Sequence, residues 1–109
     1  MIWQKGMEIW KETYHVTQQL PEDEKFGIIS QMNRAAASIS TNIAVGASRD
    51  SQKDFNRFLQ ISLGSSFELE TFLLGAKMLS YVDRNTTEKL FELIDEEQKM
   101  LMAFMKKLK

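Results

Sequence analysis

Residues 51–81 read SQKDFNRFLQISLGSSFELETFLLGAKMLSY, and this uninterrupted stretch decides the fold. Its apolar and small residues recur at spacings of four and three, which is typical of a helix that packs in a bundle. They are Phe55, Leu59, Ser62, Ser66, Leu69, Leu73, Ala76 and Leu79. Ser51 followed by Asp54 has the spacing of a capping box, so the helix is predicted to begin there. At 1.5 Å per residue it would be roughly 45 Å long.

Two glycines, Gly64 and Gly75, interrupt this predicted helix. Each costs about 1 kcal/mol relative to alanine in a helix interior. We interpret them as points of tight contact with a neighbouring helix.

Two further helices are predicted on the N-terminal side. The apolar stripe of the first is Trp3, Met7, Trp10 and Tyr14, and that of the second is Phe26, Ile29, Met32, Ala36, Ile39 and Ile43. Leu20 before Pro21 ends the first helix, because the residue before a proline is pushed away from α geometry. Pro21 itself suits the start of the second helix, and Gly46 is predicted to end it.

A fourth helix is predicted after Tyr81. Asn85 followed by Glu88 marks its start. Its core side is formed by Leu90, Ile94, Leu101, Met105 and Leu108. Three lysines lie at its C-terminal end, namely Lys106, Lys107 and Lys109. Four helices joined by short links predict an all-α protein, an antiparallel up-down-up-down four-helix bundle that forms a single domain over residues 1–109.

Composition narrows the function classes. The chain has no cysteine, no signal peptide and no apolar run of the ~20 residues that a membrane span needs, so we expect a cytoplasmic protein without a membrane partner. Its formal net charge is −1. Because phosphate neutralisation supplies most of the affinity of a nucleic-acid binder, that value argues mildly against such a role.

No catalytic constellation is present in the sequence. His15 is the only histidine and is assigned to the surface, so the chain cannot carry the Glu-x-x-His motif on two helices that a di-iron bundle requires. Glu92, Asp95, Glu96 and Glu97 are interpreted together as a solvated acidic face. There is no phosphate-binding loop or nucleophile motif. We therefore predict that the protein is not an enzyme and that it takes no cofactor, metal or small-molecule substrate.

Two glutamates lie inside the long helix. Glu68 and Glu70 are two residues apart and point in nearly opposite directions, so they cannot form one acid–base pair. One of them is predicted to pair with Arg34 across a helix contact. Asn42 is assigned a structural polar contact as well.

A basic stripe is the best candidate for a ligand-facing surface. Arg49, Lys53 and Arg57 follow one another at spacings of four, which stacks them along one face at the start of the long helix. Such a stripe could lie along a phosphate backbone, bordered by Asn56 and Gln60. The alternative, which we favour, is a solvated face in which Asp50 and Asp54 neutralise these cations.

Six segments carry a resemblance to a known family. They are WQKGME (3–8), LP (20–21), SQMNRAAASI (30–39), TNIAVG (41–46), RDS with DFNRFLQI (49–51 and 54–61), and GSSFELET (64–71). Together they resemble the 23S rRNA-intervening-sequence protein family, also called the four helix bundle protein family. The resemblance implies a homopentamer of four-helix bundles without enzymatic activity or cofactor. A related branch, the accessory variability proteins of diversity-generating retroelements, is basic and works with a reverse transcriptase and nucleic acid.

The chain departs from the family pattern at three positions. Val45 stands where the family usually has Glu, Leu63 where it usually has Arg, and Asn33 where it often has a second Arg beside Arg34. We hypothesise that an apolar Val45–Leu63 contact replaces a polar one. Fewer arginines also weaken any inference of nucleic-acid binding from the basic branch.

Two hypotheses follow for the function. The first is a non-catalytic homo-oligomer, a pentamer on the resemblance, that acts in assembly or partner binding. Its basis is an excess of apolar side chains over what one small interior can hold: Trp3, Trp10, Phe67, Phe72, Leu74, Phe91 and Phe104. The alternative is an accessory protein that binds RNA or DNA through Arg49, Lys53 and Arg57, repeated around a ring.

Overall fold

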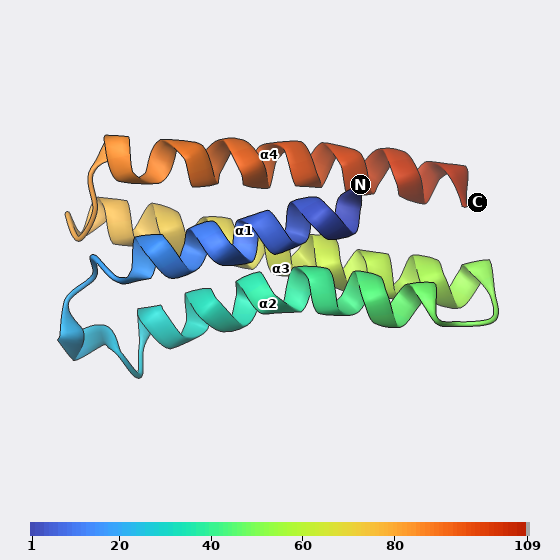
Figure 1. The fold of residues 1–109 in the computed structure, drawn as a ribbon, viewed down its shortest axis with the longest axis horizontal. Helices are drawn as coiled ribbons and strands as arrows, with labels where there is room; N and C mark the ends of the chain where they lie inside the picture. Colours follow the sequence, from blue (N-terminus) through green and yellow to red (C-terminus); the bar gives the residue numbers. More distant parts are fainter. Residues whose placement is uncertain (109) are drawn as a thin grey trace.

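The computed structural model describes residues 1–108, and Lys109 of the predicted lysine cluster lies outside them. Four α-helices make up the fold (Figure 1). They are α1 (Ile2–Thr17), α2 (Ile28–Ala47), α3 (Gln52–Met78) and α4 (Arg84–Lys107), with a short 3-10 helix, η1 (Glu22–Glu24), between α1 and α2. Residues 1–108 contain no strand, so the all-α prediction is confirmed. No helix among them is long and apolar enough to cross a membrane.

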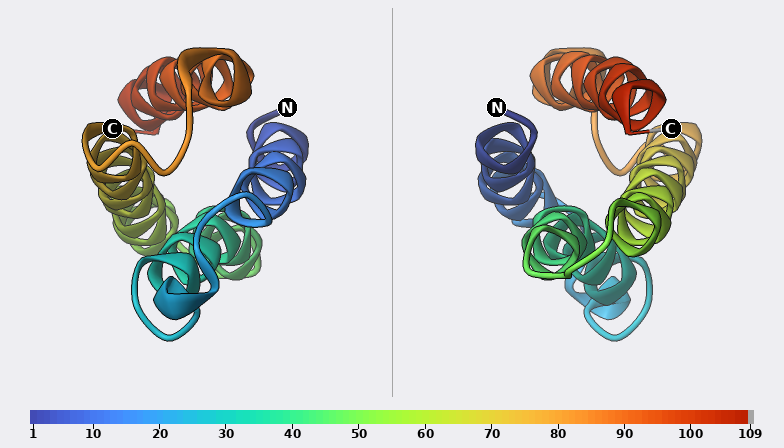
Figure 2. Two further views of the ribbon diagram at one scale, coloured as in Figure 1. Left: turned by 90° about the vertical axis from the view of Figure 1, so that its left-hand side faces the viewer. Right: turned by 90° about the vertical axis from the view of Figure 1, so that its right-hand side faces the viewer.

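The four helices lie at the corners of a quadrilateral when the molecule is viewed from either end (Figure 2). α1 packs against α2 and α4, and α3 packs against the same two helices, so α1 and α3 are diagonal. The links α1–α2 and α3–α4 lie at one end, and the α2–α3 link lies at the other (Figure 1). The core between the helices is apolar, with Ile9, Met32, Ile39, Leu59, Leu69, Leu73, Leu90, Ile94 and Leu101 fully buried.

α3 begins as its sequence predicts. The Ser51 hydroxyl accepts a hydrogen bond from the Asp54 backbone N–H (3.1 Å), which confirms the cap. The helix ends at Met78, three residues before the predicted end. Ser80 takes a left-handed conformation (φ 61°), and the Tyr81 N–H donates to the Ala76 carbonyl (2.9 Å). This bond satisfies a terminal carbonyl and turns the chain out of the helix.

The predicted start of the second helix at Pro21 is wrong. Residues 22–24 form η1, and α2 begins only at Ile28. Gly27 lies at the break, where an added Cβ would come within 2.8 Å of a Glu24 carboxylate oxygen. The Tyr81 hydroxyl donates to the other Glu24 oxygen (2.8 Å) and so joins the two links at this end of the bundle. Phe26, predicted to be in the core, is 89% exposed.

The start of α4 also differs from the prediction. Its N-cap is Asp83, not Asn85, and the Asp83 carboxylate accepts a hydrogen bond from the Thr86 N–H (2.8 Å). Hydrogen bonds from the backbone and hydroxyl of Thr86 hold the pKa of Asp83 below its ordinary value. Two capping residues stand close together in this segment, and the spacing rule alone favoured the later one.

The glycines have different environments from those predicted. α2 continues past Gly46 to Ala47, so Gly46 does not end the helix. Instead an added Cβ on Gly46 would lie 2.8 Å from the Phe58 Cβ and 2.9 Å from a ring carbon of Phe55. Gly46 therefore allows α2 and α3 to approach closely. Gly64 and Gly75, by contrast, have no neighbour within 4 Å of such an atom, so the tight contacts predicted for them are not made within residues 1–108.

α1 presents a different face to the core from the predicted one. Its buried residues are Gly6, Ile9, Thr13, Val16 and Thr17. The predicted stripe lies in solvent, with exposures from 37% for Met7 to 57% for Tyr14. The reason is close packing, since a Cβ on Gly6 would already lie 3.1 Å from the Ser40 Cβ of α2. Large rings cannot replace the small residues on that face.

Candidate functional site

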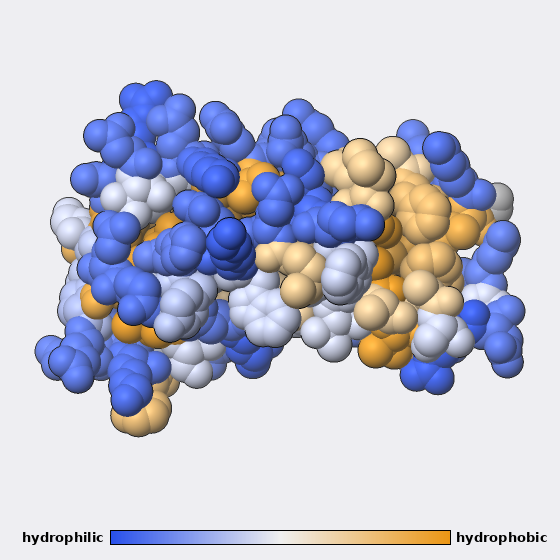
Figure 3. Space-filling model, viewed as in Figure 1, coloured by the Kyte–Doolittle hydropathy of each residue, from blue (hydrophilic) through white to orange (hydrophobic). Residues whose placement is uncertain are grey.

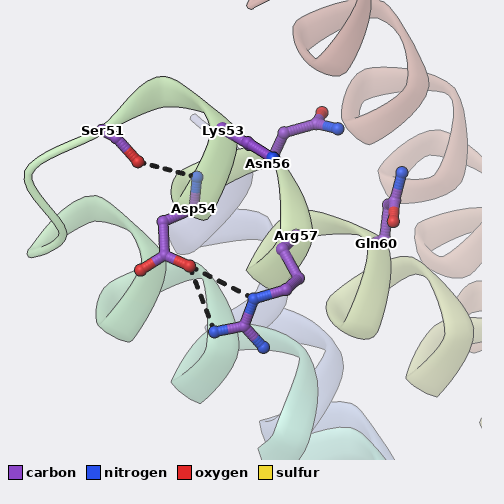
Figure 4. Close-up of a pocket in the computed structure, with 6 residues that line it drawn as sticks. All are labelled: Ser51, Lys53, Asp54, Asn56, Arg57 and Gln60. Carbon is purple, nitrogen blue, oxygen red and sulfur yellow. Dashed lines mark hydrogen bonds and ion pairs between the residues drawn. The ribbon is translucent and has the colours of Figure 1, made fainter.

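The basic stripe lies around the first turns of α3. A surface hollow there is lined by Ser51, Lys53, Asp54, Asn56, Arg57 and Gln60, as Figure 4 shows. The capped helix start fixes the backbone of this segment, because Ser51 binds the Asp54 N–H. The structure therefore places Lys53, Asn56, Arg57 and Gln60 around one hollow, whereas Arg49 is not part of its lining.

Asp54 binds both arginines of the stripe. Its Oδ1 accepts from the Arg57 Nε (3.2 Å) and lies 3.1 Å from an Arg57 terminal nitrogen (Figure 4). Its Oδ2 lies 3.8 Å from the Arg49 Nε. The two guanidinium carbons also lie over the Phe58 ring, 4.9 Å (Arg49) and 4.5 Å (Arg57) from its centroid. Ion pairs and cation–π contacts together hold both arginines in place.

The remaining groups at the hollow are less constrained. Lys53 makes no ion pair with any part of residues 1–108. The side-chain oxygen of Asn56 is buried and accepts no hydrogen bond from the same residues. With Asp50 and Asp54 set against the three cations, the segment carries one net positive charge. A phosphate would therefore meet one cation without an ion-pair partner among the described residues, Lys53, and two arginines that are already paired with Asp54.

The residues assigned to polar contacts connect the helices. Arg34 of α2 binds Glu68 of α3, and its Nε also donates to Gln31 (3.2 Å). Glu70 accepts a hydrogen bond from Gln98 of α4 (3.1 Å). The two glutamates therefore contact opposite neighbours of α3, as their two-residue spacing requires.

Asn42 belongs to a chain of hydrogen bonds between α2 and α3. Its side-chain nitrogen donates to the backbone oxygen (2.8 Å) and the hydroxyl (2.9 Å) of Ser38. The Ser38 hydroxyl lies 2.8 Å from that of Ser65. Here the small α2 side chains bring polar groups together and also allow close approach.

The α2–α3 register does not place Val45 opposite Leu63. Ser38 pairs with Ser65 and the Ile39 carbonyl accepts from Ser62 (2.8 Å), so Leu63 lies level with the middle of α2. Val45 is six residues beyond Ile39 in α2, so it lies roughly 9 Å further along the helix axis at 1.5 Å per residue. The hypothesis of a direct Val45–Leu63 contact is therefore wrong.

Glu97 was predicted to lie on a solvated acidic face, and that prediction is wrong. Its side chain is fully buried, and neither carboxylate oxygen has a hydrogen-bond partner within residues 1–108. One oxygen lies 3.3 Å from where a Gly6 Cβ would stand, beside Ser40. Burial raises the pKa of Glu97 to about 8, against the smaller opposing effects of Lys5 and the N-terminal amine. A signal was available, because residues 90, 94, 97 and 101 repeat at spacings of four, three and four.

Two exposed surfaces of the bundle are apolar. The α1 aromatic face consists of Trp3, Met7, Trp10 and Tyr14, and shallow hollows run along it. The α3 outer face consists of Gly64, Phe67, Thr71, Leu74 and Met78. Seen from the α1 side, the most hydrophobic residues gather toward the end where α1 begins, and hydrophilic residues predominate toward the other end (Figure 3).

These faces account for part of the apolar excess seen in the sequence. Of the seven large side chains named, Trp3, Trp10, Phe67 and Leu74 are exposed. The other three, Phe72, Phe91 and Phe104, pack against the core. Three of the seven are therefore accommodated against the core, and four remain outside it.

The chain is similar to a known protein family and to a solved structure. Residues 1–103 match the profile of the 23S rRNA-intervening sequence protein family. The chain is similar to the crystal structure of a protein of unknown function from the S23 ribosomal protein family of Bacteroides thetaiotaomicron. The TM-score is 0.90 at 25% identity, over 97% of this chain and 99% of that one. No curated protein matches the chain.

Proposed function

We propose that this chain, which belongs to the 23S rRNA-intervening sequence protein family, is a non-catalytic bundle that assembles with further copies of itself. One observation carries the proposal. The α1 aromatic face leaves two tryptophans, a tyrosine and a methionine in solvent, whereas the apolar core is made of other side chains.

The size of that face supports assembly. Its exposed area is roughly 400 Å², taking up to about 250 Å² for a whole aromatic side chain. This is the size of the largest apolar patch on a typical monomer, about 300–600 Å², and such patches are often functional. At about 25 cal/mol per Å², covering it contributes on the order of 10 kcal/mol before the cost of association is subtracted.

The proposal includes the finer features that the sequence predicts. The helices run antiparallel, up-down-up-down, which is supported by the short links and the contacts between consecutive helices. The assembly is a pentamer on the family resemblance. It resides in the cytoplasm, in keeping with the absence of cysteine.

Sedimentation velocity at micromolar concentration tests this function. We expect the wild-type chain to sediment as a stable oligomer, and the Trp3→Ser/Trp10→Ser double variant to shift to monomer because the apolar gain is lost. Phe26→Ser is the control, since Phe26 is even more exposed than the two tryptophans but lies in the α1–α2 link. A wild-type chain that remains monomeric would contradict the proposal.

An alternative function is nucleic-acid binding, as in the branch that works with diversity-generating retroelements. It is favoured by the hollow at the start of α3, where Lys53 is unpaired within residues 1–108 beside Arg49 and Arg57. Repetition of this segment around an oligomer would convert weak contacts into salt-sensitive avidity.

Two kinds of charge substitution around Asp54 test the alternative, because they are expected to change the affinity for nucleic acid in opposite directions. Changing Arg49, Lys53 and Arg57 to Ala is expected to abolish binding of RNA or duplex DNA. Asp54→Asn is expected to strengthen binding several-fold, because it releases both arginines. Fluorescence anisotropy at 50 and 200 mM salt measures both effects, since phosphate contacts weaken steeply with salt. Affinities that none of these changes alters would refute nucleic-acid binding through this segment.

A further inference from the structure

We infer that the α1 aromatic face of one copy packs on the α3 outer face of the next copy. This inference rests on the self-assembly proposed above and names the surfaces that meet. Both faces are apolar, both lie in solvent, and neither contacts the other within one chain, because α1 and α3 are diagonal in the bundle.

The α3 outer face has the character of an interface, because it lacks charge over several turns. The exposed positions of α3 between Arg57 and Lys77 are all uncharged, namely Gln60, Ile61, Gly64, Phe67, Thr71 and Leu74. The two glutamates in this stretch are half-buried and bound to Arg34 and Gln98. Depletion of charge is the compositional mark of an interface centre.

Gly64 is a second and independent observation. It lies on this face, weakens the helix and has no neighbour within 4 Å of an added Cβ. Nothing within residues 1–108 therefore accounts for a glycine there. A bulky side chain from a second copy does, because a glycine leaves a recess in a helix surface. The tryptophan rings of the α1 aromatic face have the size to fill it.

The areas are sufficient for a stable contact. The exposed members of the α3 outer face, from 46% for Phe67 to 77% for Met78, add roughly 300 Å² to the α1 aromatic face. The two faces together would bury roughly 700 Å² of apolar surface. Since interfaces are about 60% apolar, the whole contact would exceed about 1,000 Å², the size of a specific interface.

The positions of the two faces fix the kind of symmetry. A two-fold dimer would need both faces of one copy to meet both faces of its partner at once. The faces belong to diagonal helices and point to different sides of the bundle (Figure 2), so the contact is head-to-tail. Head-to-tail contacts generate a ring when the rotation closes and a filament when it does not.

Engineered cysteines provide the test, because the chain contains none. Met7→Cys places a thiol on the α1 aromatic face and Thr71→Cys places one on the α3 outer face. When the two single variants are co-expressed and treated with a short bis-maleimide, we expect covalent dimers that neither variant forms alone. A chain with both changes is expected to give a ladder that stops at the ring size. Glu92→Cys with Thr71→Cys is the control, since Glu92 is exposed on α4.

The outcomes separate this inference from the proposed function. An oligomer that sediments normally but gives no Met7–Thr71 cross-link overturns the pairing and leaves self-assembly in place. A monomer overturns both. Gly64→Gln adds a second readout: we expect it to dissociate the oligomer while the helix content is kept, whereas Ala44→Gln, at an exposed small residue of α2, should leave the oligomer intact. Equal assembly of these two variants would also overturn the pairing.

Discussion

Glu97→Gln is expected to stabilise the folded chain at pH 8 and to remove most of the pH dependence of its stability between pH 5 and 8. The cause is the burial of a carboxyl group whose two oxygens have no hydrogen-bond donor within residues 1–108. Burial raises its pKa from 4.5 to about 8. The charged groups that oppose this are Lys5, which is itself bound to Glu96, and the N-terminal amine.

The sign of the effect follows from proton linkage. Between pH 4.5 and about 8 the folded state keeps the Glu97 proton and the unfolded state has lost it. Stability therefore falls as the pH rises through this window, by up to about 1.4 kcal/mol per pH unit, and levels off above about pH 8. Below pH 4.5 both states are protonated, so Glu97 has no effect there. Glutamine keeps the shape of the protonated acid and carries no charge at any pH.

Urea denaturation at pH 5, 6.5 and 8 measures this difference. The variant and the wild type should have similar free energies of unfolding at pH 5 and should diverge by a few kcal/mol at pH 8. Glu92→Gln is the control, because Glu92 lies on the exposed side of the same helix. A wild-type curve that is flat from pH 5 to 8 would show that Glu97 ionises at its ordinary pKa.

Gly46→Ala is expected to destabilise the bundle by about 1–3 kcal/mol, as overpacking of a filled interior does. The new methyl group would meet the Phe58 Cβ at 2.8 Å, an atom fixed to the backbone of α3. It can be accommodated only if α2 and α3 move apart. The basic segment would move with them, since Arg49 and Arg57 lie over the Phe58 ring.

Gly75→Ala is the matched control for this substitution. It is also a glycine inside a helix, but its added methyl group meets nothing within 4 Å. The gain in helix propensity is then about 1 kcal/mol in favour of the folded state. Thermal unfolding should therefore move in opposite directions for the two variants, and a shift of the same sign in both would contradict the packing argument.

α3 was the element best predicted from the sequence, because local rules fix it. A cap, a long 4-3 repeat and the absence of proline all point to one helix, and the structure buries Leu59, Leu69 and Leu73 on the predicted side. The start of α2 and the cap of α4 were missed. Both depend on how the links pack, as the Tyr81–Glu24 hydrogen bond shows.

The face that α1 buries could not be predicted from periodicity. A 4-3-4 spacing of large residues indicates a helix and says nothing about which neighbour covers that stripe. The choice was made by Gly6 and Thr13, whose small size lets α1 approach the rest of the bundle. Glu97 was misassigned for a related reason, since a charged residue was read as solvated although it occupies a core position of α4.

At the basic segment, the sequence indicated which residues lie close together, but it did not determine which cations are paired and with which groups. The pairing of Arg57 with Asp54 follows from a three-residue spacing on a helix. The stacking of Arg49 on Phe58 does not, because it depends on how the α2–α3 link turns. The free and the occupied cations could therefore be told apart only in the folded structure.

The contact between α1 and α4 joins the two ends of the chain, and this has a consequence for how the bundle folds. The other helix contacts join consecutive elements, whereas Lys5 and Glu96, which link α1 to α4, are 91 residues apart. Distant contacts form late, because the entropy of closing a long loop must be met first. Glu97 lies in this late contact, against Gly6. Its ionisation should therefore accelerate unfolding and leave the folding rate nearly unchanged, so that one proton sets the lifetime of the native bundle.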